Sequence, residues 1–477
     1  MDPEAGGRSA DRRWWLGLGL IVLAGLALRV VYVWFYRRGI DLRGDPVYYH
    51  DAANLLADGK GFINPFAYEE GRIVQGADHP PLYIVYLAVF SLLGLRSVTA
   101  HLLASCLLGA GAVGMGGLAG REVAGRRVGW LTAALMALYP NVWRFDGMVL
   151  SETMVIFTVM LTVFLAYRCW RQPSPKALAW VGVAVAAATL ARSELGLLLP
   201  LLLVPMAIGT ARRLGRPAWR LVGVGLAAAG ALLGPWVVFN LIRFDRLVLL
   251  SSQMEVTLAV SNCESVYYGD LIGYWDLGCG REILDRHQIR AEFSEAEAQR
   301  VLLGDTLDYM REHRDRIPTV IAARLGRITG VFRPRQQINI DVAVELFPRR
   351  VMEAATISYW LLVPFAVGGI VVLRRRGVPV YPVLAPAITV LITVALFYSS
   401  MRFRASAEGP LCLLAAVGIA ALAARWWPER DPTTGSRGPD SVAGRTAEPE
   451  SAIDAPGMAD GQSERETSAG ASAATTS

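Results

Sequence analysis

The chain has 477 residues, of which 53% are hydrophobic and only 18% are charged, and its formal net charge is +6. So few charges exclude disorder as the main state and argue against an ordinary soluble enzyme, because soluble domains carry about 25% charged residues. The basic excess could suit nucleic acid, but the arginine clusters stand between long apolar runs, where they orient membrane helices. The composition predicts an integral membrane protein without a nucleic-acid partner.

Eleven apolar runs follow one another along the chain, and several are shorter than the ~20 residues that cross a bilayer. They lie at about 14–36, 81–95, 98–119, 128–140, 147–167, 177–191, 195–210, 219–241, 356–373, 378–398 and 405–425. Arg12 and Arg13 precede the first run, and Arg37 and Arg38 follow it without a small-residue cleavage site. We therefore expect the first run to be an uncleaved anchor.

The basic clusters decide whether the short run 81–95 spans the membrane. If this run lies at the surface, all six clusters fall on one side, as the positive-inside rule requires. If it spans, the first cluster is separated from the other five. The clusters are Arg12/Arg13, Arg121/Arg126/Arg127, Arg168/Arg171/Lys176, Arg212/Arg213/Arg216/Arg220, Arg374/Arg375/Arg376 and Arg425/Arg430. The sequence thus predicts ten spans, cytoplasmic termini, and a juxtamembrane or re-entrant helix over 81–95.

These spans predict an all-α membrane protein with one large insertion on the outer side. The expected parts are a cytoplasmic N-terminus at 1–13, a transmembrane module at 14–241 with an outer loop at 37–80, an extracytoplasmic domain at 242–355, C-terminal transmembrane helices at 356–425, and a cytoplasmic tail at 426–477. The tail is rich in Gly, Ser, Ala, Pro and acids, and this composition predicts disorder.

The insertion should contain helices and one covalent cross-link. Ser294 and Glu297 form a capping box that opens a helix ending near His313. Helical spacing over 317–331 predicts an amphipathic helix on the membrane surface. Cys263 and Cys279 stand sixteen positions apart in an outward loop, where oxidising conditions favour a disulfide. The alternative is two unpaired buried thiols.

One familiar letter pattern is rejected by its context. Gly109, Gly111 and Gly114 match the dinucleotide-binding fingerprint, but they stand inside an apolar run with no preceding strand. Close packing of helices through small residues is the expected role of these glycines. The five His residues are scattered without metal-ligand spacing.

Acidic, aromatic and basic side chains gather at the predicted outer ends of the helices. Asp45 opens a short amphipathic stretch that contains Tyr48 and Tyr49, and Asp78 and His79 directly precede the juxtamembrane helix. Further polar residues at this level are Glu152, Arg192, Glu194, Arg402 and Arg404, with Arg29 about two turns inside the first span. Each has a simpler interpretation as a helix cap, a local ion pair or a snorkelling side chain.

Carboxylates beside arginines at the level of the lipid head groups suit a substrate with a phosphate on a lipid. Arginine forks bind phosphate bidentately, and a carboxylate can take a proton from an attacking hydroxyl. A lipid phosphate leaves readily, so no strong general acid is required. This chemistry predicts glycosyl transfer from a polyprenyl-phosphate sugar outside the cytoplasm.

The same residues resemble the GT-C superfamily of membrane glycosyltransferases, in the group of protein O-mannosyltransferases, the lipid A aminoarabinose transferase and rhizobial lipopolysaccharide glycosyltransferases. The motifs that carry the resemblance are Asp45 with Tyr48–Tyr49, Ala53, Leu56, Gly59 and Gly61; Asp78-His79-Pro80-Pro81-Leu82; Tyr139–Pro140 and Ser151–Glu152; and Arg402-Phe403-Arg404 with Pro410. Asn262–Trp275 is similar to an outer loop of actinobacterial members, for which mannose or arabinose are the candidate sugars. The resemblance covers about 14–425.

The resemblance implies roles for single residues. Asp45 would be the base or acceptor-binding acid, and Asp78 and Glu152 would support the acceptor or the sugar. His79, Arg402 and Arg404 would hold the lipid phosphate, Arg192 is a further candidate, and Tyr48 and Tyr49 would bind substrate. The expected partners are a polyprenyl-phosphate sugar, membrane lipids, and an extracytoplasmic glycan, lipid or protein acceptor. Inversion is expected; no cofactor is required, although the superfamily includes enzymes with a divalent metal.

The sequence differs from the family pattern at two positions, and two other functions are alternatives to this interpretation. Pro46 stands where many protein mannosyltransferases have a second acid, and aminoarabinose transferases more often have Lys at the place of His79. One alternative is a flippase or other transporter of lipid-linked sugars, which would show internal repeats and polar groups near the midplane. The other is a polymerase or ligase of lipid-linked oligosaccharides.

Overall fold

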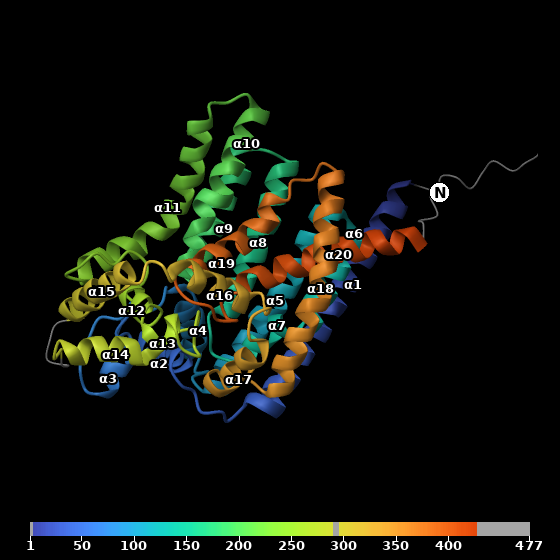
Figure 1. Ribbon diagram of the computed structural model, residues 1–477. Helices are drawn as coiled ribbons and strands as arrows, with labels where there is room; N and C mark the ends of the chain where they lie inside the picture. Colours follow the sequence, from blue (N-terminus) through green and yellow to red (C-terminus); the bar gives the residue numbers. More distant parts are fainter. Residues whose placement is uncertain (1–2, 290–294, 427–477) are drawn as a thin grey trace, which may run out of the picture. The chain divides into compact units, whose positions relative to one another are not determined.

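The computed structural model describes residues 3–289 and 295–426, and these residues form helices joined by loops (Figure 1). An isolated β-bridge joins Ile63 and Gln75 in the first long loop. The predicted all-α class is therefore confirmed for the described part of the chain. Two predictions fall outside it, namely the disordered tail beyond residue 426 and the capping residue Ser294.

Seven segments of the described chain are long and apolar enough to cross a membrane. They are Asp11–Arg37, which comprises most of α1 (Pro3–Tyr32) and a π-helical turn (Val33–Arg37); α5 (Val98–Ala124); α8 (Glu152–Arg171); Ser193–Leu214, which ends in α10 (Val204–Leu214); α11 (Ala218–Arg243); α18 (Arg349–Arg375); and α20 (Ala405–Trp426). Shorter apolar helices are α4 (Leu82–Leu92), α9 (Pro175–Ala191) and α19 (Tyr381–Leu396). The multi-pass character is confirmed, while the number of ten spans, which would also include α6 (Arg126–Leu138), remains a prediction.

The loops that carry the basic clusters meet at one end of the helix bundle. Asp11 near the start of the first span accepts from Arg121 at 2.7 Å and from Arg126 at 2.8 Å, on the turn between α5 and α6. Further contacts at this end join Arg171 to Glu122 at 3.5 Å, Arg213 to the Trp170 carbonyl, and the Tyr167 hydroxyl to the Pro379 carbonyl at 2.8 Å. The loops that carry the basic clusters therefore lie at the same end of the bundle, as the positive-inside rule requires.

The first outer loop folds at the opposite end into α2 (Asp45–Ala57), α3 (Pro65–Glu69) and α4. With 11 residues α4 is about 16 Å long, roughly half of the ~30 Å hydrocarbon core. Tyr83 shares a 2.6 Å hydrogen bond with Ser105, and Tyr86 donates to the Ala104 carbonyl at 2.7 Å, so α4 lies along the first turns of α5. This placement agrees with a juxtamembrane helix rather than a span.

A buried ion pair fixes the first span to the bundle. Arg29 Nε lies 2.6 Å from Asp146 Oδ2, both side chains are 0% exposed, and Thr153 donates to the other carboxylate oxygen at 2.7 Å. Because a buried charge is costly without a partner, this pair holds α1 against the short turn that precedes α8. Gly109 on α5 makes room for it, since a Cβ there would collide with the Asp146 carboxylate.

Two further glycines of α5, outside the fingerprint pattern, allow close approach of neighbouring helices. A Cβ at Gly117 would lie 2.5 Å from Leu18 of α1, and one at Gly120 would lie 2.6 Å from Thr132 of α6. Between α18 and α20 the same device recurs, since Cβ atoms at Gly369 and Gly418 would collide with backbone carbonyls of the partner helix. Of the three fingerprint glycines, Gly109 is closely packed, whereas a Cβ at Gly111 or Gly114 would lie at an ordinary 3.4 or 3.6 Å from its nearest neighbour.

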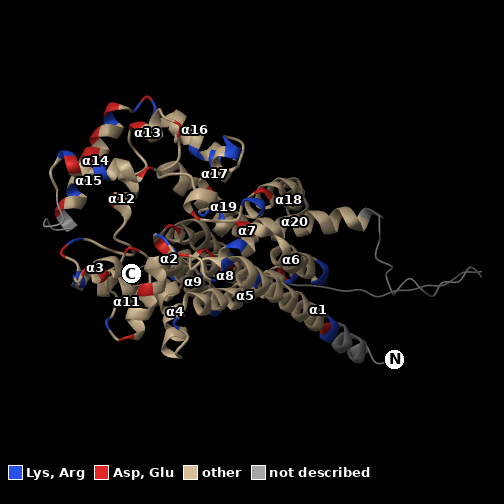
Figure 2. Cartoon of the chain, turned by 90° about the horizontal axis from the view of Figure 1, so that it is seen from below, with Lys and Arg blue, Asp and Glu red and all other residues tan. Residues whose placement is uncertain are grey.

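The insertion is built from short helices that carry many of the charged residues (Figure 2). They are α12 (Met254–Ala259), α13 (Glu264–Tyr267), α14 (Leu277–Arg286), α15 (Glu295–Glu312), α16 (Ile317–Ile328) and α17 (Pro334–Val344). The helix predicted to end near His313 ends at Glu312. The predicted helix over 317–331 is α16, and Arg324 on it is buried and donates to the carbonyls of Ala395 and Ser261. The insertion is therefore fastened to the end of α19.

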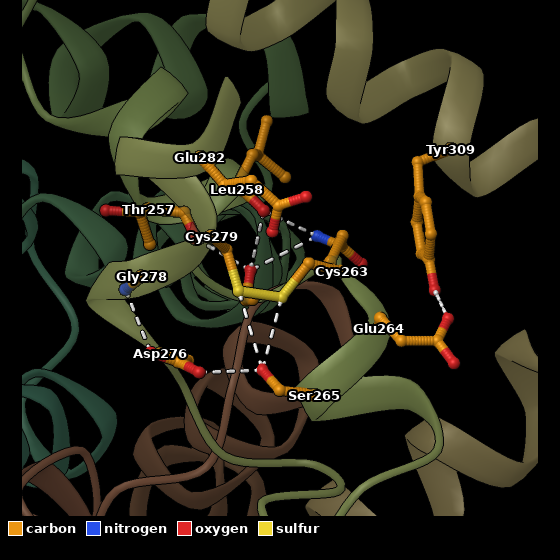
Figure 3. Close-up of a disulfide and its surroundings, with 12 residues drawn as sticks. Thr257, Leu258, Cys263, Glu264, Ser265, Asp276, Gly278, Cys279, Glu282 and Tyr309 are labelled. Atoms are coloured by element: carbon orange, nitrogen blue, oxygen red, sulfur yellow. Dashed lines mark hydrogen bonds between the residues drawn. A yellow bond between two sulfur atoms is a disulfide. The ribbon is translucent and has the colours of Figure 1, made fainter. Parts of the chain in front are cut away.

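Cys263 and Cys279 form a disulfide with a Cα–Cα distance of 6.0 Å, which closes the loop between α13 and α14 (Figure 3). Beside it, Ser265 donates to Asp276 at 2.8 Å, and Asp276 accepts from the Gly278 amide at 2.8 Å. From the same loop the Gly273 carbonyl accepts a 3.0 Å hydrogen bond from the Ser399 amide. The cross-linked loop thus leads directly to the segment between α19 and α20.

Gly109→Ala should destabilise the protein, whereas Gly114→Ala should not. The added methyl group at 109 meets the Asp146 carboxylate, while the one at 114 lies at an ordinary 3.6 Å from Val22. Overpacking of this kind costs about 1–3 kcal/mol. Thermal unfolding in detergent measures the difference; equal midpoints for the two variants would contradict the packing at Gly109.

Cysteines placed at Arg126 and Arg213 should resist a membrane-impermeant maleimide added to intact cells. A cysteine at the exposed Arg72, in the first outer loop, should react and serves as the positive control. The native cysteines give little background, because Cys106, Cys169 and Cys412 are buried and the other two are bridged. Labelling at 126 from outside would restore a span over 81–95.

Candidate active site

Arg402, in the loop between α19 and α20, holds three carboxylates that come from distant parts of the chain. Its Nη1 lies 2.8 Å from Asp45 Oδ2 and 3.4 Å from Glu345 Oε1, and its Nε lies 2.6 Å from Glu152 Oε1. Asp45 begins α2, Glu152 begins α8, and Glu345 follows α17. The first two positions suit acids, since the free amides at a helix N-terminus favour negative charge.

A second arginine shares the same glutamate. Arg192 Nη1 lies 2.8 Å from Glu152 Oε1, and its Nε lies 2.5 Å from Glu194 in the turn after α9. The Arg192 guanidinium also lies 4.6 Å from the centre of the Phe403 ring. The local pair expected in this turn therefore exists, but it is part of the larger cluster.

His79 completes the cluster on the side of the first outer loop. Its Nε2 lies 3.5 Å from Asp45 Oδ1. Tyr49 stacks on the His79 ring at 4.6 Å, and Tyr48 meets it edge-on at 5.1 Å. Both tyrosines are buried, so they act as a frame that orients His79 toward Asp45.

The charges of the cluster hold Asp45 in its ionised form. Burial alone would raise the pKa of Asp45, but the Arg402 guanidinium and His79 outweigh it and hold the pKa well below the usual range. Burial raises the pKa of Glu345, and Arg402 offsets only part of this rise because Asp45 and Glu152 repel further negative charge. Asp45 is thus a carboxylate whose basicity is suppressed by its ion pairs.

Asp78 lies one residue from His79, but its carboxylate bonds to other groups. It accepts from Asn64 at 3.2 Å and from Ser252 at 3.1 Å, while its backbone amide donates to the Tyr48 hydroxyl at 3.3 Å. These bonds join α2, the end of the first outer loop and the start of the insertion. The structure therefore places Asp78 as a support behind Tyr48 and His79.

Arg404 does not join Arg402, although the two stand in one sequence motif. Its Nε lies 2.5 Å from Glu408 Oε1, and its Nη1 donates to the Ile328 carbonyl at 3.1 Å. Tyr139 donates to the same Glu408 at 2.8 Å, and Tyr359 lies under the guanidinium at 3.8 Å. Arg404 is buried in the packing of α20, apart from the cluster in which the sequence interpretation had placed it.

Sequence reasoning missed Glu345. It follows an amphipathic helix of the insertion and belongs to none of the motifs, so the sequence offers no signal that it reaches Arg402. No group of three or more His, Cys, Asp or Glu in residues 3–289 and 295–426 is arranged to hold a metal ion. The expectation that no cofactor is required remains a prediction.

Comparison with known proteins supports the resemblance that the motifs indicated. Residues 78–239 match the family model described as dolichyl-phosphate-mannose-protein mannosyltransferase. The predicted kinship with the mannosyltransferase group of GT-C enzymes is thereby confirmed. The matched segment contains His79, Glu152 and Arg192, whereas Asp45 and Arg402 lie outside it. No curated protein sequence matches the chain.

Solved structures of an archaeal oligosaccharyltransferase share the fold of this chain. The oligosaccharyltransferase AglB of Archaeoglobus fulgidus, in complex with an inhibitory peptide and a dolichol-phosphate, matches with 13% identity and a TM-score of 0.50 over 88% of this chain and 53% of that chain. The oligosaccharyltransferase of that organism tethered to an acceptor peptide matches with 12% identity and a TM-score of 0.52 over 90% and 52%. The chain spans about half the length of these relatives, and at such identities the likeness shows the fold alone.

ArnT of Cupriavidus metallidurans, bound to undecaprenyl phosphate, is similar at a lower level. The identity is 14% and the TM-score is 0.41 over 85% of this chain and 79% of that chain.

Arg404→Met should destabilise the protein by about 3–5 kcal/mol, because it leaves Glu408 charged and buried without its partner. Adding Glu408→Gln to this variant should recover part of the loss. Thermal unfolding in detergent measures both effects. A midpoint for Arg404→Met equal to that of the wild type would show that the pair does not stabilise the bundle.

Proposed function

We propose that the protein is a membrane glycosyltransferase that moves a sugar from a polyprenyl-phosphate donor to an extracytoplasmic acceptor. The observation that carries the proposal is the convergence of Asp45, Glu152 and His79 on or beside Arg402, at the helix ends opposite the basic loops. The family match over 78–239 supports the same chemistry. A location at helix ends favours a transferase over a transporter, whose polar groups gather near the midplane.

The basic loops give the orientation. By the positive-inside rule they face the cytoplasm, together with both termini, so the Arg402 cluster faces outward. There the phosphate of a polyprenyl donor lies at the level of the head groups while its chain stays in the bilayer. The acceptor is a cell-envelope glycan, lipid or protein that approaches from the outer aqueous side.

In the proposed reaction, Arg402 and His79 bind the donor phosphate, and Arg192 adds positive charge behind Glu152. The acceptor hydroxyl attacks the anomeric carbon, and the bond between this carbon and the phosphate oxygen breaks. The electron pair leaves with the phosphate, whose negative charge is stabilised by the Arg402 guanidinium and by a hydrogen bond from His79. The hydroxyl proton passes to Asp45. Attack opposite the leaving phosphate inverts the anomeric carbon.

The remaining predicted residues act through these groups. Tyr48 and Tyr49 hold the His79 ring, and Asp78 holds Tyr48 and the loop that carries His79. Glu152 keeps Arg192 and Arg402 side by side through one shared oxygen. Arg404 secures α20, the helix that follows Arg402. These five are positioning residues in the proposal.

Asp45→Asn should abolish sugar transfer. Loss of the base predicts a rate lower by about 10²–10⁴-fold, while Asp41→Asn, which removes an equal charge from the exposed part of the same loop, should retain transfer. Membranes that contain each variant are supplied with radiolabelled polyprenyl-phosphate mannose or arabinose, and label in membrane acceptors is counted. Unchanged transfer by Asp45→Asn would remove Asp45 as the base.

A further inference from the structure

The two side chains proposed to hold the donor phosphate already share an anion. Asp45 Oδ2 lies 2.8 Å from Arg402 Nη1, and the other oxygen of the same carboxylate lies 3.5 Å from His79 Nε2. The carboxylate thus bridges Arg402 and His79 with one oxygen each. The two non-bridging oxygens of a donor phosphate that bridged the same two side chains would lie in these positions, because Arg and His donate to carboxylate and phosphate oxygens alike.

The three carboxylates on Arg402 differ in how readily an incoming anion can displace them. The Asp45 side chain is 39% exposed, whereas those of Glu152 and Glu345 are 0% and 9% exposed. Glu152 is also held by Arg192 at 2.8 Å. An anion that arrives from outside therefore meets Asp45 first, and the two buried glutamates keep the guanidinium in place.

A phosphate and the Asp45 carboxylate cannot both occupy this position. Two anions on the same pair of side chains repel each other, so the incoming phosphate must displace the carboxylate or bind weakly. A carboxylate held by Arg402 and His79 is also a poor proton acceptor. The base needed for transfer becomes available only when these two contacts are broken.

We propose that Asp45 occupies the place of the donor phosphate on Arg402 and His79, and that donor binding displaces its carboxylate and frees it to act as the base. This inference rests on the proposed function and adds an order of events to it. The donor binds first and exchanges with Asp45, and only then can the acceptor hydroxyl lose its proton. Because Asp45 is the first residue of α2, its side chain can turn away without a change in the helix.

The exchange predicts that loss of the Asp45 carboxylate has opposite effects on lipid-phosphate binding and on sugar transfer. Asp45→Asn, which should abolish transfer, should bind a sugar-free polyprenyl phosphate more tightly than the wild type. Removing a competing partner of partly exposed cations predicts a dissociation constant lower by about three- to ten-fold. Binding is measured by the quenching of intrinsic tryptophan fluorescence or by calorimetry, with the purified protein in lipid nanodiscs.

Two further variants separate competition from a general effect of charge. Asp41→Asn removes the same charge four residues away on the exposed part of the loop and should leave the dissociation constant unchanged. In an Arg402→Gln background, Asp45→Asn should no longer tighten binding, because the shared cation is absent. Equal or weaker binding by Asp45→Asn, or equal tightening by Asp41→Asn, would overturn the exchange. Unfolding midpoints exclude variants that do not fold.

The ligand is tested with three probes. Undecaprenyl phosphate should show the tightening, whereas undecaprenol, which lacks the phosphate, should not. If inorganic phosphate competed at the same concentrations as the lipid, the ligand would be a soluble phosphate and the lipid assignment would be overturned.

The outcome is independent of the transfer assay. Tightening by Asp45→Asn without any transfer by the wild type would support the exchange and contradict the proposed function. Transfer by the wild type without tighter binding by Asp45→Asn would support the proposed function and contradict the exchange.

Discussion

The guanidinium of Arg402 joins segments of the chain that are separated by up to 357 positions. It contacts Asp45 at the start of α2, Glu152 at the start of α8 and Glu345 at the end of α17. The first outer loop, the helix bundle and the insertion therefore share one charged group. Because an arginine has several donors, it can bind three carboxylates at once. The cluster therefore joins the three segments. In our proposal, the donor phosphate competes with one of these carboxylates for the guanidinium.

Other charged pairs in the structure bring this cluster into place. Arg29 and Asp146 fix the first span next to the turn that leads into α8, and Arg404 and Glu408 fix the start of α20. Both pairs are buried, so removing one partner is costly, and each restricts how the helices can shift. Glu152 lies shortly after Asp146 in the chain, and Arg402 lies shortly before Arg404, so the two buried pairs restrain the segments that carry the cluster. Among the three carboxylates on Arg402, that of Asp45 is the most exposed.

Helix bounds, the family resemblance and several candidate residues could be predicted from the sequence. The helix that ends at Glu312, the helix at Ile317 and the short helix after Pro81 lie where the sequence predicted helices. Asp45, His79, Glu152, Arg192 and Arg402 meet as the sidedness argument requires. The sequence interpretation placed Arg402 and Arg404 in the same site. Two residues so close in the chain lie at the same level of the membrane, but their side chains point to different sides where a helix begins.

The sequence by itself determined whether each segment lies in the bilayer or in water. Runs of apolar residues indicate the parts that lie in lipid, and the basic loops indicate which helix ends lie on the same side. What only the tertiary structure decided is which charges meet. Glu345 reaches Arg402 because the insertion folds back onto the end of α19, and Asp45 bridges Arg402 and His79 because two tyrosines hold the imidazole beside it. Such contacts depend on angles and distances between remote elements, and hydrophobic periodicity carries no information about them.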